Sequence, residues 1–371
     1  MIKKTIKLSV VAALFATGAF AESTSLKDAF ANGKASGDIS IYAENVSNNG
    51  DTKDSGFSMG SIGVNYETDT LNGFKASFGA RTNHNFSEKE DGDYDGIDED
   101  TGKVIDTPTV AINTLNLSYA TEGVTVIAGR QEIDLEWMGD YHEALVAAIT
   151  AVPDTTIVLG HTERFMAVDN DAALEEMGDI GEDGANVIDV KYEGIANTVI
   201  NPYYMDANDI FSAYGLKATT SVANVDLTAH YAATNEDTLD EDGSIAHFEI
   251  GTTVSDIALA AGYITTDTDV GAGSIATLGD NIDPTESLGD SIYGADADTF
   301  YASISADVSM VTLGALYTTV DHADDRDSEI TLTASAAITD ELGLDVLYSS
   351  VSMEDSDEDS DTVSMMLTYS F

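Results

Sequence analysis

The strongest constraint on the fold is that apolar side chains recur at every second position over most of the chain. In residues 363–371 one face carries only apolar side chains, namely Val363, Met365, Leu367, Tyr369 and Phe371. Such alternation is typical of a β-strand with one apolar face. Similar segments lie at residues 74–81, 225–231 and 330–338. Their second faces carry Gly, Ser and Thr with a few charged residues, which suits strands that separate lipid from a wet lumen.

The connectors between these strands come in two sizes that alternate along the chain. The short turns include residues 121–123, 152–154, 255–256 and 307–309. The long, acidic connectors cover about residues 84–109, 165–186 and 267–298. Short turns on one rim and long loops on the other are typical of transmembrane barrels, whose strands have about 9–11 residues. We therefore predict an all-β fold: a transmembrane antiparallel β-barrel with short periplasmic turns and long acidic extracellular loops.

The number of strands depends on one ambiguous stretch. Seventeen segments alternate clearly, whereas bacterial single-chain barrels have an even number of strands. The parity fails between the segment that ends at Arg130 and the one that begins at Thr155, where residues 142–151 are the only candidate for another strand. Including this stretch predicts about eighteen strands. The same stretch also fits a short helix in the lumen, which would leave sixteen.

The N-terminus predicts a signal peptide. Three lysines precede an apolar stretch from Leu8 to Phe15, and residues 19–21 fit the small-x-small pattern for cleavage after Ala21. The apolar stretch is shorter than the about 20 residues that a helix needs to span a bilayer. We expect export, with residues 1–21 as the signal peptide and residues 22–371 as a single barrel domain.

The mature chain has 67 acidic and 12 basic residues. The eight predicted outer loops hold 46 of the acidic residues and cover residues 47–56, 84–109, 131–141, 165–186, 234–243, 267–298, 321–329 and 354–361. This balance argues against nucleic acid as a partner, because phosphate binding needs a basic face. The apolar faces would meet lipid, where only a closed sheet satisfies every backbone group. The absence of cysteine excludes disulfides and thiol catalysis.

Three short motifs, together with the signal peptide, resemble a known family. They are residues 25–34 (SLKDAFANGK), residues 128–132 (AGRQE) and the terminal Tyr369-Ser370-Phe371. The chain thereby resembles the outer-membrane porins of campylobacteria, which are akin to the eighteen-stranded substrate-specific porins of pseudomonads. The resemblance implies a trimeric, water-filled diffusion channel for ions and small hydrophilic solutes in a Gram-negative outer membrane.

The same resemblance implies partners and an assembly signal. The partners are outer-membrane lipid, lipopolysaccharide, the barrel-assembly machinery and two further copies of the chain. Tyr369 and Phe371 are similar to the terminal signal that the assembly machinery recognises. The resemblance implies no required cofactor and no enzymatic activity.

The resemblance also implies that the third outer loop, Gln131 to Tyr141, folds inward and narrows the channel. Trp137 is its candidate packing anchor. The candidate constriction residues are Arg130, Glu132, Asp134, Glu136 and Asp140. Family members place a pore-facing arginine at the position of Arg130, whereas strict alternation along residues 124–130 directs this side chain outward.

Alternation places five basic residues on the lumen wall: Lys75, Arg81, Arg164, Lys191 and Lys217. Substrate-specific relatives line the pore with a basic ladder, so this small set weakens the case for uptake of anions. Acidic groups at a throat concentrate cations. We therefore predict a cation-selective pore.

The acidic loops also suggest a cation site. Asp91, Asp93 and Asp95 match the first half of an EF-hand loop, but Gly102 occupies the position where a bidentate Glu is needed. Weak Ca²⁺ binding by the outer loops and plain solvation both remain open.

Two other classes of protein compete with a channel. A secreted soluble Ca²⁺-binding β-solenoid or surface-interaction protein would also be acidic and free of cysteine, but the sequence shows no fixed short repeat. A barrel enzyme is the second class, although the six histidines are scattered and no Ser/His/Asp grouping can be placed.

Overall fold

The computed structural model describes residues 23–98, 101–239, 241–279, 282–322, 325–354 and 356–371. The predicted signal peptide therefore lies outside the described residues. In the described part of the chain, the few helices are too short and too polar to cross a membrane.

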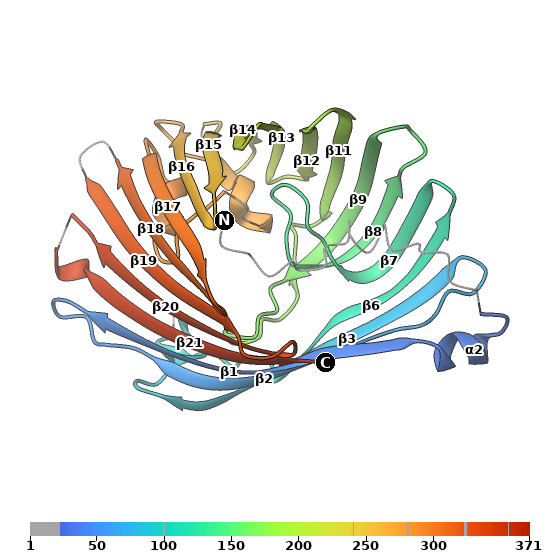
Figure 1. Cartoon of the computed structure of the whole chain (residues 1–371), viewed down its shortest axis with the longest axis horizontal. Coiled ribbons are helices and arrows are strands. Elements are labelled where there is room, and N and C mark those ends of the chain that lie inside the picture. Colours follow the sequence, from blue (N-terminus) through green and yellow to red (C-terminus); the bar gives the residue numbers. More distant parts are fainter. Residues whose placement is uncertain (1–22, 99–100, 240, 280–281, 323–324, 355) are drawn as a thin grey trace.

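Eighteen long strands form one antiparallel sheet that closes on itself (Figure 1). They are β1 Lys34–Asn48, β2 Phe57–Glu67, β3 Phe74–Glu88, β6 Val110–Thr121, β7 Val124–Glu132, β8 Tyr141–Ile149, β9 Thr155–Met166, β11 Ala185–Ile195, β12 Thr198–Ala207, β13 Phe211–Val222, β14 Val225–Glu236, β15 Ser244–Val254, β16 Ile257–Thr266, β17 Asp298–Val308, β18 Val311–Asp321, β19 Arg326–Ala337, β20 Leu342–Ser352 and β21 Ser360–Ser370. Each strand pairs with the next along the chain, and the first pairs with the last, with Ile41 opposite Leu367. The predicted all-β barrel is confirmed.

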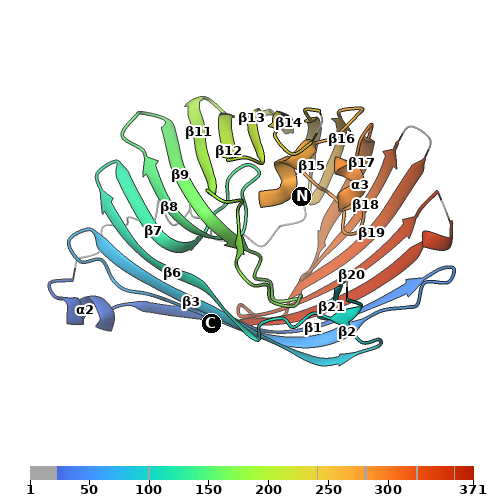
Figure 2. The same ribbon diagram turned by 180° about the vertical axis from the view of Figure 1, so that it is seen from behind.

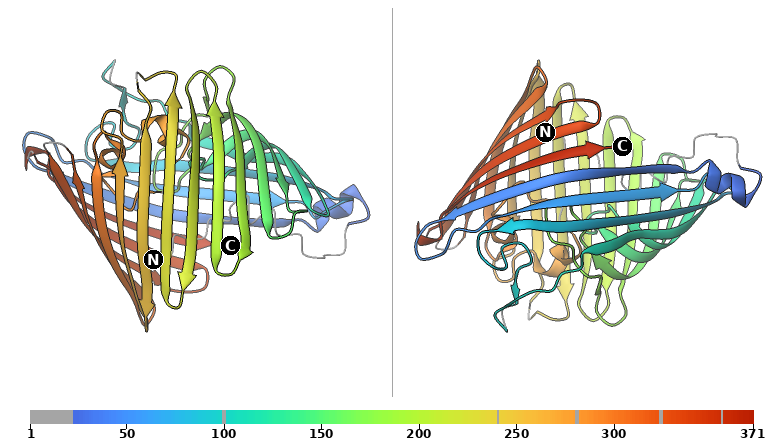
Figure 3. Two further views of the ribbon diagram at one scale, coloured as in Figure 1. Left: turned by 90° about the horizontal axis from the view of Figure 1, so that it is seen from above. Right: turned by 90° about the horizontal axis from the view of Figure 1, so that it is seen from below.

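The remaining elements are short and lie in the connectors or before β1. They are α2 Leu26–Ala31, β4 Ile97–Asp98, β5 Lys103–Val104, β10 Gly178–Asp179, η1 Gly273–Leu278, α3 Gly289–Tyr293 and η2 Ser356–Glu358. The strands tilt strongly, so that β1–β3 run across β14–β16 when the molecule is seen from above (Figure 3). Tilt of this kind accompanies barrel closure.

The ambiguous stretch at residues 142–151 is a strand. It corresponds to β8, which pairs with β7 on one side and β9 on the other. Alternate residues of β8 differ sharply, because Ala144 and Val146 are buried whereas Leu145 between them is exposed. The strand count is therefore eighteen. The sixteen-strand alternative and the solenoid alternative are both wrong, because β8 completes a ring that a solenoid would leave open.

Alternation separates two faces around the whole barrel. Large apolar residues such as Leu115, Leu216 and Phe248 are about half exposed on the outward face. Their neighbours in sequence are directed into the interior, where many are buried. Exposed apolar area of this extent on a closed sheet is what a lipid environment would cover.

Part of the interior is filled by two connectors that fold back into the barrel. Trp137 and Met138 from residues 133–140, and Ile275, Leu278 and Ile292 from residues 267–297, are almost completely buried against inward-facing wall residues. Figures 1 and 2 show the segment that carries η1 and α3 within the ring of strands. The two connectors also touch, because the Gly139 N–H donates to the Leu278 carbonyl oxygen at 3.0 Å.

A third connector, residues 167–177, crosses the interior as a strap from β9 towards β1 and β3. The Asn83 amide donates to the carbonyl oxygens of Asp169, at 2.9 Å, and Ala172, at 2.7 Å. The Ser40 hydroxyl donates to the Asn170 carbonyl oxygen at 3.2 Å. Leu174 of the strap is fully buried.

These inward folds correct one expectation from the sequence. We predicted residues 165–186 and 267–298 to be exterior loops, and both do begin at the rim with the long connectors. Each then turns inward, because it carries apolar residues at intervals along an otherwise acidic segment and these residues pack against the wall.

Candidate functional site: the barrel interior

Two inward-facing basic side chains on β3 are paired with carboxylates. The Arg81 guanidinium binds Asp38 through two nitrogens, at 2.7 and 2.9 Å, and donates to the Ser61 hydroxyl at 2.6 Å. Lys75 binds Glu67 at 2.5 Å. Bidentate pairs between arginine and a carboxylate fix the geometry of both groups. The positive charge of this wall is therefore locally neutralised.

Across the barrel, Lys217 on β13 is paired with the third outer loop. Its ammonium group lies 2.9 and 3.1 Å from the two carboxylate oxygens of Glu136, whose side chain is nearly buried. The neighbouring Trp137 is fully buried, and its indole N–H donates to the Tyr203 hydroxyl at 2.7 Å. The loop is therefore attached to the wall by an ion pair and by the indole. Trp137 lies where a packing anchor was predicted.

More polar groups surround this attachment point. Asp189 on β11 is buried and accepts a hydrogen bond from Asn201 at 2.9 Å. Lys191 follows Asp189 on the same face and interacts with it electrostatically. His230 of β14 and His247 of β15 lie opposite each other in the sheet. The wall beside Glu136 is thus a mixed surface rather than a basic ladder.

Two carboxylates from the wall hold the backbone of residues 267–297. Glu236 accepts from the Ser274 N–H and hydroxyl, both at 2.8 Å. Glu329 is buried and accepts from the N–H groups of Glu286 and Ser287, both at 3.0 Å. Glu249 accepts from the Tyr301 hydroxyl at 2.7 Å. These carboxylates lie on interior faces without a basic group among their hydrogen-bond donors in the described residues.

This clamp, formed by Glu236 and Glu329 on residues 267–297, was not predicted from the sequence. Glu236 and Glu329 were counted with the acidic outer loops, where they looked like solvated charges. The available signal was the strand alternation, which extends to both residues and directs them inward.

The other predicted constriction residues lie in different surroundings. Glu132 ends β7 opposite Tyr141. Asp134 is exposed, and Asp140 has a positive φ of 65° at the end of the loop. The structure therefore brings Glu136 into contact with a basic wall residue and leaves Asp134 in solvent.

Arg130 and Arg164 both lie next to Glu143 on the outward face near the rim of the long loops, at 3.8 and 3.7 Å from its carboxylate. Arg130 lies opposite Leu115 on one side and Glu143 on the other, so it faces outward as strict alternation predicts. Its predicted place among the constriction residues is therefore wrong. Arg164 was predicted on the lumen wall, and this placement needs correction. A bulge between Glu143 and Ala144 shifts the pairing, so that Arg164 also lies opposite Glu143. Arg164 binds Asp179 at 2.9 Å. Lys75, Arg81, Lys191 and Lys217 keep the predicted inward face.

The candidate cation site and the candidate assembly signal lie at opposite ends of the barrel. Asp93 accepts from the N–H groups of Gly56 and Glu90, and Asp95 accepts from Thr107, so these carboxylates already organise the loop. In the described residues, no group of three or more His, Asp or Glu side chains is arranged to hold a metal ion. Tyr369 and Phe371 lie at the other rim, where their rings stack with centroids 6.4 Å apart.

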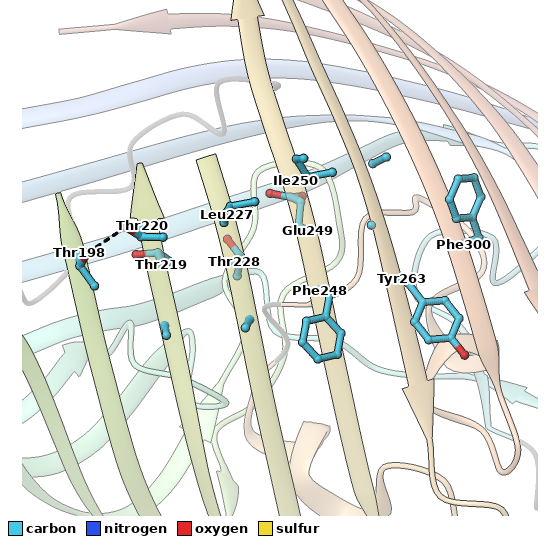
Figure 4. A pocket seen from close by; sticks show the side chains of 14 residues that line it. Thr198, Thr219, Thr220, Leu227, Thr228, Phe248, Glu249, Ile250, Tyr263 and Phe300 are labelled. Carbon is cyan, nitrogen blue, oxygen red and sulfur yellow. Dashed lines mark hydrogen bonds between the residues drawn. The ribbon is translucent and has the colours of Figure 1, made fainter. Parts of the chain in front are cut away.

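One hollow of about 630 Å³ lies on the outward face, across strands β12–β17 (Figure 4). Small residues, including Ala218, Ala229 and Ala261, leave it open between the larger Phe248 and Tyr263. Both of these large side chains are exposed on the outward face. This hollow therefore belongs to the surface that would meet lipid and is not part of the interior.

Comparison of the sequence with protein-family models and with curated proteins found no match. The fold, in contrast, is similar to solved structures of Occ porins. OccAB1 of Acinetobacter baumannii aligns with a TM-score of 0.76 and 12% identity, over 93% of this chain and 98% of that one. For OccK8 (OprE) of Pseudomonas aeruginosa the TM-score is 0.72 and the identity 14%, over 92% and 99%. OpdK of the same organism, solved with vanillate, gives 0.72 and 10%, over 91% and 98%.

At these identities the likeness establishes the fold. The chain is an eighteen-stranded closed antiparallel barrel with the architecture of the Occ porins.

Proposed function

We propose that this chain is an outer-membrane porin, a water-filled channel that passes ions and small hydrophilic solutes and favours cations. The barrel fold and its likeness to Occ porins support the channel. The observation that supports cation preference is the pairing of inward-facing basic residues with carboxylates, seen at Arg81, Lys75 and Lys217. Further interior carboxylates are not paired with a basic side chain. Glu249, for example, accepts its hydrogen bond from the Tyr301 hydroxyl.

The physical reason is local. Charges on outer loops are screened beyond about 8 Å at physiological salt, so only groups in the interior act on a permeating ion. A paired lysine or arginine contributes little net positive potential, whereas interior carboxylates concentrate cations. Anionic solutes would meet three inward-facing basic groups, Lys75, Arg81 and Lys217, that are already paired with carboxylates. A channel of this kind differs in preference from one built around a basic ladder.

The test is to insert the purified protein into a planar bilayer that separates two KCl concentrations and to measure the reversal potential. We expect K⁺ to be favoured over Cl⁻. The variant Glu136→Gln should shift the reversal potential towards anions, because it leaves Lys217 without its carboxylate. Glu122→Gln is the matched control, since it removes the same charge from an exposed short turn. Anion preference of the unaltered protein would overturn the proposed selectivity.

The charge set of the third loop is tested in the same way. Amides in place of Asp134, Glu136 and Asp140 together should reduce cation preference more than Glu136→Gln alone. If all three changes leave selectivity where it was, the loop is not the constriction.

We further propose that the chain is related to the campylobacterial porins that its short motifs resemble, that it assembles as a homotrimer and that Phe371 belongs to an assembly signal. Phe371 forms two backbone hydrogen bonds with Gly37, each 3.0 Å long. Its deletion should lower the yield of heat-modifiable barrel in the outer-membrane fraction. Cross-linking in intact cells should give a ladder that ends at three copies. Normal yield after deletion, or a ladder that ends at one copy, would contradict the respective proposal.

A further inference from the structure

The short helix α2 leaves two large apolar side chains exposed. Leu26 is 66% exposed and Phe30 is 54% exposed. They are four residues apart and therefore share one face of the helix. Ala29, in contrast, is only 3% exposed and packs towards the barrel. The helix stands beyond the ends of β1–β3, at the edge of the molecule (Figures 1 and 3).

The position of this helix is fixed by several bonds to the turn between β2 and β3. The Asp69 N–H donates to the Ala29 carbonyl oxygen at 2.9 Å. The Ser23 hydroxyl donates to the Asp69 carboxylate at 2.6 Å. The Tyr66 hydroxyl donates to the carbonyl oxygen of Phe30. Hydrogen bonds from Ser23 and the Thr70 N–H also lower the pKa of the Asp69 carboxyl. The face of α2 that carries Leu26 and Phe30, called the apolar edge below, is thus held in one orientation.

The apolar edge lies on the outward side of the barrel. Tyr66 follows Ile62 and Val64 in the outward-facing series of β2, and both of those residues are exposed. The ring of Phe30 stacks on the ring of Tyr66, with centroids 6.5 Å apart and planes 18° apart. Because Tyr66 is directed away from the lumen, Phe30 lies on that side as well.

Other aromatic residues extend this surface along the same rim. Phe74 begins β3 and packs on Tyr119 of β6, with centroids 4.6 Å apart. Tyr369 and Phe371 lie at the corresponding end of β21. All four of these side chains are exposed. Aromatic residues at a strand end on the outward face are typical of the membrane–water interface. The edge of α2 is therefore continuous with the surface proposed to meet lipid.

We propose that α2 is an interfacial anchor, whose Leu26 and Phe30 side chains insert into the phospholipid leaflet at the rim of the short turns. Lys27 is exposed beside them and would lie among the phosphate headgroups. An apolar edge next to a basic residue is the pattern of segments that lie in the plane of a membrane. This inference rests on the proposed membrane location of the barrel and adds a second, peripheral contact with lipid.

Single-cysteine variants test the anchor directly, because the chain contains no cysteine. We would place nitroxide labels at Leu26→Cys and Phe30→Cys in the full protein, reconstituted in vesicles of phosphatidylethanolamine and phosphatidylglycerol. Lys27→Cys is the matched control on the helix, and Ile62→Cys is the control on the barrel wall. The measurement is the ratio of collision rates with oxygen, which partitions into lipid, and with a water-soluble nickel complex.

We expect the ratio of the oxygen rate to the nickel rate to be severalfold higher at positions 26 and 30 than at position 27. Position 62 should also give a high ratio. Leu26 is so exposed that its substitution leaves the fold intact, which keeps the test valid even if Phe30→Cys disturbs Tyr66. Access to the nickel complex at positions 26 and 30 would overturn the anchor. Exclusion of both reagents there would also overturn it and would point to a second copy of the chain. A label at position 62 in water would instead refute the membrane location itself.

Discussion

The interior of the barrel has two halves that differ in what covers them. The apolar half comprises the inward faces of β7–β18, where residues 133–140 and 267–297 pack on a cluster of buried apolar side chains, with polar groups such as Asp189 and Lys217 among them. The polar half comprises the inward faces of β1–β3, where Arg81 binds Asp38 and Ser61 and the strap at residues 167–177 is held by hydrogen bonds. The comparison indicates that strands of one alternating pattern can carry both a wall covered by packed connectors and a wall of paired polar side chains. A solute path is expected to run between the two halves, bounded by the polar half on one side and by the loop that carries Glu136 on the other.

The largest effect is expected from Trp137→Ala in the apolar half. Removal of a fully buried tryptophan typically costs about 3–5 kcal/mol of stability, and here it would release the loop that carries Glu136. We expect a lower melting temperature and unsteady single-channel currents. Trp137→Phe is the control, because it retains most of the volume and loses only the bond to Tyr203. Equal melting of Trp137→Ala and the unaltered protein would mean that the loop does not depend on the cluster.

The next largest effect is expected from Glu329→Gln, which acts on the clamp of residues 267–297. A hydrogen bond to a charged group contributes about 1.5–3 kcal/mol, and the amide would keep one acceptor oxygen but turn its NH2 group towards one of the two N–H groups. Hydrogen exchange of the backbone at Glu286 and Ser287 should become faster. Glu354→Gln, an exposed change on the following loop, should leave this exchange unchanged. Slow exchange in both variants would show that packing alone holds the segment.

A smaller effect is expected in the polar half, from Asn83→Ala. This change removes two hydrogen bonds to the strap, and each such bond contributes about 1 kcal/mol. Because fewer contacts hold the strap than hold the clamped segment, we expect a higher single-channel conductance with little change in melting temperature. Asn65→Ala, an exposed residue of the same type on β2, is the control. Unaltered conductance in Asn83→Ala would place the solute path away from the strap.

The smallest effect is expected outside the barrel, where the acidic loops offer a third environment. Asp93 and Asp95 already accept hydrogen bonds within their loop, so we expect Ca²⁺ to bind weakly through what remains. Binding at a concentration equal to the dissociation constant stabilises by about 0.4 kcal/mol. Chelation should therefore lower the melting temperature only slightly, and Asp91→Asn should remove the difference. Identical melting with millimolar Ca²⁺ and with chelator would leave solvated loops as the interpretation.

Much of the fold could be predicted from the sequence, because strand alternation is a local property. A residue's face in a strand depends only on its distance from its neighbours along the chain. The inward faces of Lys75, Arg81 and Lys217 followed from this rule. The strand β8 and the count of eighteen rested instead on the even number of strands in bacterial barrels, which left a lumen helix and sixteen strands open until the structure decided. The rule failed at Arg164, because a bulge in the β8–β9 pairing shifts the alternation. Nothing in the local pattern marks that bulge.

Only the tertiary structure decided which connectors enter the barrel and what they meet there. Gly139 meets Leu278, and Asn83 meets Asp169. These contacts join residues far apart in the chain, and no short-range pattern encodes them. Nothing in the sequence distinguishes the carboxylates of Glu136, Glu236 and Glu329 from those of Asp134 or Asp91. Their separate roles arise because closure of the barrel brings an amine, a backbone N–H or solvent within reach of each one, and the free energy of a carboxylate depends on which of these it meets.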